Sequence, residues 1–238
     1  EGVSLSEIAV LYRAHFHALD LERCLPRAHV PYVIVSGIRF FEQAHIKDVC
    51  SLLRLMQSKT DELAFSRLLK LLPGVGERTV AKLWHALGNT FDIRSKSQRD
   101  SLSKALRPSA RERWQKIAAL APPRKEDVDG EAIIRGFVEA FYEDHLVKSY
   151  ENFDRRLDDV AALSEDVTKF ESVEGFLSDV ALLTNVDAEG AGAESEPEDS
   201  VRLSTVHQAK GLEWTAVIIL WATDGMFPSS RSLQESTD

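Results

Sequence analysis

The chain has 238 residues, of which 44% are hydrophobic and 28% charged, which is typical of a soluble globular protein with one large domain or two modest ones. No segment resembles an export signal, and the longest apolar run near the C-terminus, 216–222, is too short to span a bilayer, so we expect a cytoplasmic protein without a membrane partner. Cys24 and Cys50 are the only cysteines, which argues against a disulfide scaffold or a zinc site, and we expect no metal site.

The net charge of −9 is unevenly distributed along the chain. Taken alone, it argues against a nonspecific nucleic-acid binder, because phosphate binding needs clustered Lys and Arg. Segment 92–125, however, contains ten Lys and Arg residues against three acids, whereas acids outnumber bases several-fold in 126–200. The basic segment is a candidate phosphate-binding surface, and the alternative is an ordinary solvated helical face.

The hydrophobic pattern changes twice along the chain. Apolar runs at 8–13 and 32–35 predict strands, with a helix at 17–25 between them, which indicates an α/β unit with a parallel sheet. From 46 to 183 apolar residues recur at helical spacing, and the Gly- and acid-rich segment 186–200 predicts a linker or surface loop. Further strands are predicted at 201–205 and 217–220. We therefore expect an α/β fold with a partial parallel sheet and a large all-α insertion, divided as 1–36, 37–200 and 201–238.

A Pro-Gly-Val-Gly turn at 73–76 joins two predicted helices. Its glycines expose backbone amides at a helix N-terminus, where the helix dipole favours a phosphate, and such contacts are independent of base sequence. This pattern predicts a helix-hairpin-helix-like turn, and the alternative is a plain tight turn. A dinucleotide-binding loop is a poor interpretation, because a helix and not a strand precedes the glycines.

Polar side chains also follow the predicted strand 201–205. Thr205, His207 and Lys210 can donate hydrogen bonds to phosphate oxygens. Gly211 permits close approach of a ligand to the backbone, and Glu213 can accept a hydrogen bond from a ribose hydroxyl. Spacing alone makes this a weak signal, because a histidine near a strand end is more often structural.

Several segments resemble motifs of the UvrD/Rep/PcrA-type DNA helicases of superfamily 1A. TVHQAKGLEW at 205–214 is similar to helicase motif V, and DGMFP at 224–228 to its continuation. IAVLYRAHFHALDLERCL at 8–25 resembles a motif that contacts single-stranded DNA, with His15 where the family has Asn. SGIRFFEQAHIKD at 36–48 resembles the entry to an inserted subdomain, with Gln43 and His45 at positions usually held by Arg and Glu; we expect Lys47 and Asp48 there to be surface or hinge charges. Segments 150–157 and 173–177 resemble later inserted helices.

The resemblance implies that 1–36 and 201–238 form part of the second RecA-like motor domain and that 37–200 forms the inserted 2B subdomain. The residues expected to contact single-stranded DNA are Tyr12, Arg13, His15, Thr205, His207 and Lys210. Those expected to face the ATP cleft are Gly211 and Glu213. Those expected to contact duplex DNA are Gly74, Val75, Gly76, Arg78 and Thr79. For Tyr12, the alternative is that its ring packs within the sheet.

The implied function is part of an ATP-dependent 3′–5′ helicase for repair or replication restart, acting on single-stranded DNA and duplex junctions. ATP and Mg²⁺ would be the cofactors of the intact enzyme, completed by a first motor domain. The chain has no G-x-x-x-x-G-K-[ST] loop and no strand ending in an Asp-Glu pair, so we expect it to hold no catalytic residues, bind neither cofactor alone and be inactive in isolation. The alternatives are a duplex- or junction-binding module, a surface that docks a repair protein, and part of a helicase–nuclease.

Overall fold

The computed structural model describes residues 2–35, 38–125, 128–190 and 199–223. The chain divides into two compact units, which are described separately below. Unit 1 comprises Glu1–Gln43 together with Leu182–Asp238, and unit 2 comprises Ala44–Ala181. Unit 1 is therefore built from two segments that are far apart in the sequence.

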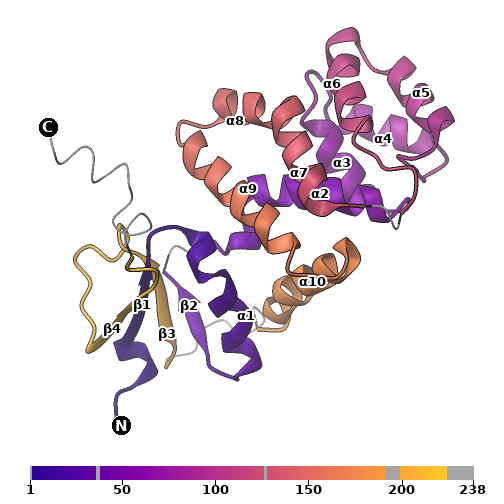
Figure 1. Cartoon of the computed structure of the whole chain (residues 1–238). Helices are drawn as coiled ribbons and strands as arrows, with labels where there is room; N and C mark the ends of the chain where they lie inside the picture. Colours follow the sequence, from indigo (N-terminus) through magenta and orange to yellow (C-terminus); the bar gives the residue numbers. More distant parts are fainter. Residues whose placement is uncertain (1, 36–37, 126–127, 191–198, 224–238) are drawn as a thin grey trace, which may run out of the picture. The chain divides into compact units, whose positions relative to one another are not determined.

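Unit 1 contains a four-stranded parallel sheet (Figure 1). Its strands are β1 (Ile8–Tyr12), β2 (Tyr32–Ile34), β3 (Val201–Thr205) and β4 (Ala216–Ile219), in the order β2-β3-β1-β4. All the strand pairs are parallel, as expected from the sequence. Because β3 lies between β1 and β2, neither segment of unit 1 can form this sheet without the other.

Helical turns and one longer helix accompany the sheet. They are η1 (Leu5–Glu7), η2 (His15–Ala18), α1 (Leu19–Arg27) and η3 (Phe40–Glu42). Apolar side chains from both chain segments meet in one core, which includes Val10, Ile34, Val201 and Leu203. Burial of such side chains stabilises a fold by roughly 1.5–3 kcal/mol each, so the core fixes β3 beside β1.

Unit 2 is helical throughout its described residues. Its elements are α2 (Ala44–Gln57), α3 (Glu62–Lys70), α4 (Glu77–Ala86), α5 (Lys96–Ala105), α6 (Pro108–Ala118), α7 (Gly130–Phe137), the π-helical η4 (Val138–Tyr142), α8 (Glu143–Ser149), α9 (Phe153–Val167) and the first part of α10 (Val173–Gly190). Phe65 lies at the centre of an aromatic core, with ring centroids 5.0 Å from Trp84 and 5.2 Å from Phe91. The helical periodicity predicted for 46–183 is confirmed by these elements. Among the described residues, no helix is long and apolar enough to cross a membrane.

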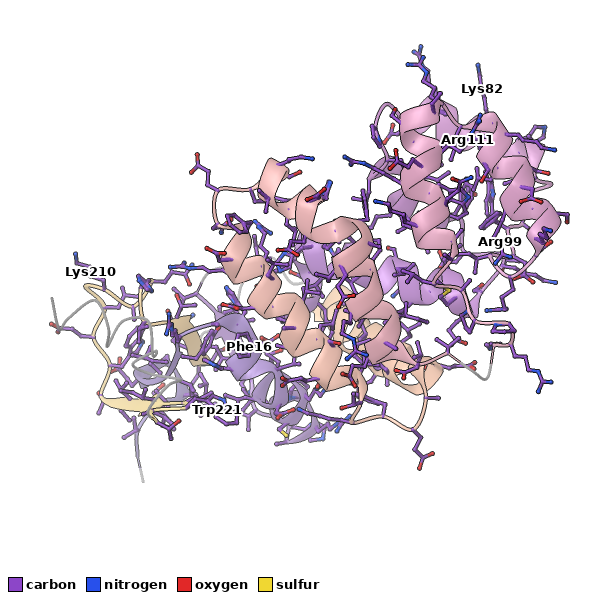
Figure 2. The ribbon with its side chains drawn as sticks, turned by 45° about the horizontal axis from the view of Figure 1, so that its top comes forward. Phe16, Lys82, Arg99, Arg111, Lys210 and Trp221 are labelled. Atoms are coloured by element: carbon purple, nitrogen blue, oxygen red, sulfur yellow. The ribbon has the colours of Figure 1, made fainter. Side chains whose placement is uncertain are left out.

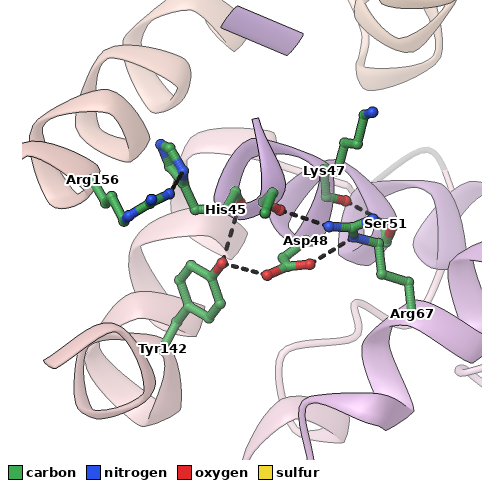
Figure 3. A network of polar contacts seen from close by, with 8 residues as sticks. His45, Lys47, Asp48, Ser51, Arg67, Tyr142 and Arg156 are labelled. Carbon is green, nitrogen blue, oxygen red and sulfur yellow. Dashed lines mark hydrogen bonds and ion pairs between the residues drawn. The ribbon is translucent and has the colours of Figure 1, made fainter. Parts of the chain in front are cut away.

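A buried polar network ties the start of α2 to three other elements of unit 2 (Figure 3). Asp48 accepts hydrogen bonds from Arg67 Nε at 2.6 Å and from the Tyr142 hydroxyl at 2.7 Å. His45 Nε2 lies 3.1 Å from Asp159 Oδ2 on α9. Of the two roles expected for Asp48, a surface or a hinge charge, the surface role is wrong, because only 4% of the residue is exposed and both its carboxylate oxygens are bonded inside the unit.

The two compact units divide after Gln43 and after Ala181, whereas the expected domains divide after residues 36 and 200 and stay a prediction. The first difference has a packing cause: Arg23 of α1 lies over the Phe41 ring, with its guanidinium carbon 5.8 Å from the centroid, so η3 packs within unit 1. The second boundary falls inside α10, because Leu183 and Thr184 border a small hollow of unit 1 together with Glu22 and Phe41. α10 continues to Gly190, so the first part of the expected linker 186–200 is helix, formed by residues that include the good helix formers Ala188 and Glu189. Residues 191–198 of that segment, and the motif continuation at 224–228, lie outside the described residues.

Candidate functional site

The expected strand-end residues lie at the carboxyl edge of the parallel sheet in unit 1. Tyr12 and Thr205, the last residues of β1 and β3, are paired in register. The ladder continues one step, because the Val206 amide donates to the Tyr12 carbonyl at 2.9 Å. Arg13 follows β1 and His207 follows β3, and both are exposed. Open parallel sheets bind their ligands at this edge.

Thr205 shapes the turn that follows β3. Its hydroxyl donates to Gln208 Oε1 at 2.9 Å, and its carbonyl accepts from the amides of Gln208 and Ala209, each at 3.0 Å. The hydroxyl proton is therefore used within the turn and is not free for a phosphate. Thr205 is better described as the residue that holds the turn, while His207 and Lys210 are its exposed hydrogen-bonding side chains.

Gly211 and Glu213 lie further along the same loop, and both are exposed. Gly211 has φ +87°, a conformation that favours glycine, and a Cβ built on it would have no atom within 4 Å. The backbone is thus open to a ligand at this point. An exposed carboxylate and an open glycine are chemically suited to a ribose hydroxyl and a phosphate, and the nucleotide role of these two residues stays a prediction.

Tyr12 does not have the position expected of a DNA-stacking residue. Its side chain is fully buried in the core of unit 1, and its hydroxyl has no hydrogen-bond partner among the described residues. Burial raises the pKa of Tyr12, with the nearby Glu22 carboxyl adding to the effect. Burial also raises the pKa of Glu22 to about 7. We therefore withdraw Tyr12 from the DNA-contact set, in favour of the alternative that its ring packs in the sheet. Half-buried His15 stays in that set, its ring edge-on to Tyr12 with centroids 6.0 Å apart.

The sequence analysis missed one exposed aromatic residue at this edge. Trp221 lies just beyond β4 with 52% of its surface exposed. Its indole Nε1 donates to the carbonyl of His17 at 3.1 Å, and its φ is +56°. The apolar run that contains Trp221 did not predict that this side chain is exposed, because its exposure depends on which strand lies beside β4.

The glycine turn of unit 2 has part of the geometry expected for phosphate binding. Gly74 has φ +70° and is exposed, and Gly76 caps α4 without a side chain that could bond the first helical amides. Val75 does not have the position expected of a residue that contacts duplex DNA, because its amide donates to the Leu72 carbonyl at 3.2 Å and its side chain is buried. Arg107, which was not assigned to this site, has Nη1 4.0 Å from the position of a Cβ on Gly74. Arg78 and Thr79 are exposed on the first turn of α4.

The basic segment that follows is only partly a free surface. Helices α5 and α6 border a hollow of about 650 Å³ whose lining includes Arg99, Lys104 and Arg111. Arg111 donates to the carbonyls of Ser103, Lys104 and Leu106 at 2.6, 3.3 and 3.0 Å, so it caps the C-terminus of α5. Both arginines are labelled in Figure 2, together with Lys82 of α4. Within the described ranges, no group of three or more His, Cys, Asp or Glu residues is arranged to hold a metal ion.

These features define an α/β protein with a candidate ligand site at the carboxyl edge of a parallel sheet, and with a helical unit formed by the residues that separate, in sequence, the two segments of the sheet-bearing unit. The chain belongs to the UvrD-like helicase C-terminal domain family, whose model matches residues 1–237. It is 31% identical to DNA helicase II of Escherichia coli over 98% of the chain, and 29% identical to DNA helicase II of Salmonella typhimurium over 98%. It is 26% identical to the ATP-dependent DNA helicase PcrA of Staphylococcus aureus over 100%. In each case the chain spans 34% of the relative's length.

Proposed function

We propose that this chain is part of an ATP-dependent DNA helicase that moves 3′ to 5′ on single-stranded DNA. The observation that carries the proposal is the juxtaposition, at one sheet edge, of exposed Arg13 with the loop that carries His207 and Glu213. Cations and hydrogen-bond donors there suit a phosphate chain, and the carboxylate suits a nucleotide. Unit 1 would act as the second RecA-like motor domain, and unit 2 as its inserted helical subdomain.

ATP would bind between unit 1 and a first motor domain elsewhere in the same polypeptide. Gly211 and Glu213 would hold the nucleotide from the side of unit 1, with Mg²⁺ and the phosphate cradle supplied by the other domain. When bound, ATP supplies the free energy that drives directional movement. The residues of this chain would position the nucleotide. They would also transmit a change in the shape of the ATP cleft to Arg13 and His207, which face the DNA.

Unit 2 would contact duplex DNA ahead of the junction. The proposed ligands are the open amides after Gly76 with Gly74, Arg78 and Thr79, and Arg107 joins them because its guanidinium lies beside Gly74. The positive end of α4 and two guanidinium groups would bind phosphates without reading sequence. Lys104 extends this surface along α5, while Arg111 donates to the end of α5 and Arg99 donates to the Ile93 carbonyl at 3.3 Å, so both arginines are engaged within the fold.

Unwinding of tailed duplexes by the full-length protein tests the proposal. We expect ATP-dependent unwinding with a 3′ single-stranded tail and none with a 5′ tail, and no unwinding or ATP hydrolysis by this chain alone. Arg78→Ala should slow unwinding and lower the salt dependence of duplex binding by about one phosphate contact, while leaving ATP hydrolysis stimulated by single-stranded DNA unchanged. Arg135→Ala, which removes an exposed arginine paired to Glu131 elsewhere in unit 2, is the matched control. Unwinding only with the 5′ tail, or DNA-stimulated ATP hydrolysis by the isolated chain, would contradict the proposal.

A further inference from the structure

Trp221 is hydrogen-bonded at one edge of its indole, while about half of its surface is open to solvent. The hydrogen bond from its Nε1 to the His17 carbonyl fixes one edge of the indole. The His17 ring lies 6.1 Å from the indole and 4.3 Å from Phe16, so the indole borders a small aromatic group in unit 1 (Figure 2). Half of Trp221 is nevertheless exposed. An indole with a fixed orientation and an open surface loses little conformational entropy when a flat ligand stacks on it.

The backbone at Trp221 is strained. A φ of +56° is uncommon for any residue except glycine and is an outlier for a bulky one. Such conformations cost free energy, persist where the surroundings hold them in place, and cluster at ligand sites. Here the indole hydrogen bond and the bond from the Thr223 amide to the Trp221 carbonyl at 2.8 Å help to hold the turn.

The sheet register places Trp221 level with Arg13. Leu11 of β1 pairs with Ile219 of β4, and the Leu220 amide donates to the Leu11 carbonyl at 2.9 Å. Arg13 and Trp221 each lie two residues beyond that pair, at the same edge of adjacent strands. The exposed side chains of Arg13 and Trp221 therefore follow adjacent strands at the same edge of the sheet.

We propose that Trp221 stacks on a base of single-stranded DNA while Arg13 neutralises a neighbouring phosphate. Proteins that bind single strands without sequence preference combine these two elements, because every base has a π-face and every nucleotide a charge. The proposal rests on the function proposed above and assigns a contact with single-stranded DNA to an aromatic residue other than Tyr12, the aromatic residue first expected to make one. A protein segment that covers the exposed apolar side chains of β4 is the competing occupant, but Trp221 lies beyond the end of that strand, which is adjacent to the strand that Arg13 follows.

Equilibrium binding by the full-length protein without ATP tests the proposal with two probes: an oligothymidylate, and an abasic deoxyribose-phosphate oligomer of equal length. Trp221→Ala should weaken binding to the oligothymidylate by about tenfold, the fold-change expected for loss of one stacked base, and leave binding to the abasic oligomer unchanged. Trp221→Phe should keep most of the affinity, because it keeps a ring. Leu63→Ala, which truncates an exposed apolar side chain on α3, is the matched control.

Indole fluorescence gives a readout that a purely structural role would not move. Oligothymidylate should quench the wild-type emission more than that of Trp221→Phe, and the abasic oligomer should quench the two alike. If Trp221→Ala loses the same affinity for both probes, Trp221 is covered by a protein segment and does not stack on a base, and the proposal is overturned. Unchanged binding to both probes would overturn it as well. If the wild-type protein binds neither probe, the proposed helicase function itself fails; if it binds both and Trp221→Ala behaves as wild type, only the stacking role fails.

Discussion

Glu213→Ala in the full-length protein should lower kcat/KM for ATP by about tenfold to a hundredfold. Glu213 is exposed on the loop after β3, next but one to the open Gly211, and its carboxylate is the proposed acceptor for the ribose. A hydrogen bond to a charged group contributes roughly 1.5–3 kcal/mol, which corresponds to that loss of rate. The measurement is steady-state ATP hydrolysis with saturating single-stranded DNA.

Two further variants separate the causes of that loss. Glu213→Gln keeps an oxygen acceptor but removes the charge, so it should fall between the wild type and Glu213→Ala. Glu139→Ala removes an exposed acid from unit 2 and should leave hydrolysis unchanged. Wild-type hydrolysis by Glu213→Ala would show that this loop does not face the nucleotide.

Arg67→Met should lower the free energy of unfolding of the chain by about 3 kcal/mol. Arg67 Nε donates to Asp48 at 2.6 Å, and Nη2 donates to the Ala44 carbonyl at 2.9 Å. Removing one partner of a buried ion pair typically costs about 3–5 kcal/mol, because a charge is left without compensation. We expect the lower end of that range, because the Arg67 side chain is 35% exposed and water can reach part of the gap. Denaturant titration followed by circular dichroism measures the change.

Lys70→Met is the matched control for that experiment. The Lys70–Glu77 pair is 3.6 Å apart, with side chains 42% and 85% exposed, so its loss should cost less than about 1 kcal/mol. Adding Asp48→Leu to Arg67→Met should recover part of the stability, because the uncompensated carboxylate is then gone. A double variant less stable than Arg67→Met would indicate that packing around Asp48, and not its charge, stabilises this part of unit 2.

The local sequence pattern predicted the helices and strands. It could not predict the burial or exposure of side chains that depends on contacts between those elements. The apolar run at 8–12 and the helical spacing in 46–53 depend on short-range periodicity, and both predictions are confirmed as β1 and α2. The burial of Tyr12 depends on β3 arriving beside β1 from the far end of the chain. The exposure of Trp221 depends on β4 being at one end of the strand order in the described sheet. Neither outcome follows from neighbouring residues.

The same distinction applies to the glycine turn and to Asp48. Pro-Gly-Val-Gly predicted a helix start correctly, but which amides stay open depends on the turn geometry, which uses the Val75 amide within the fold. Arg107 reaches Gly74 through the folding of α6, which sequence separation conceals. Asp48 follows a lysine and resembles a surface charge in sequence. Its partners in the fold, Arg67 and Tyr142, lie on other helices, so the local sequence does not reveal them.

Photo-cross-linking of a 4-thiothymidine oligonucleotide to the full-length protein tests the central claim most directly, because it maps where the single strand lies. We predict cross-links in peptides that carry Arg13–His17 and His207–Trp221, at the carboxyl edge of the sheet in unit 1. Cross-links confined to other surfaces, such as the amino ends of β1 and β3 at Ile8 and Val201, would contradict the account.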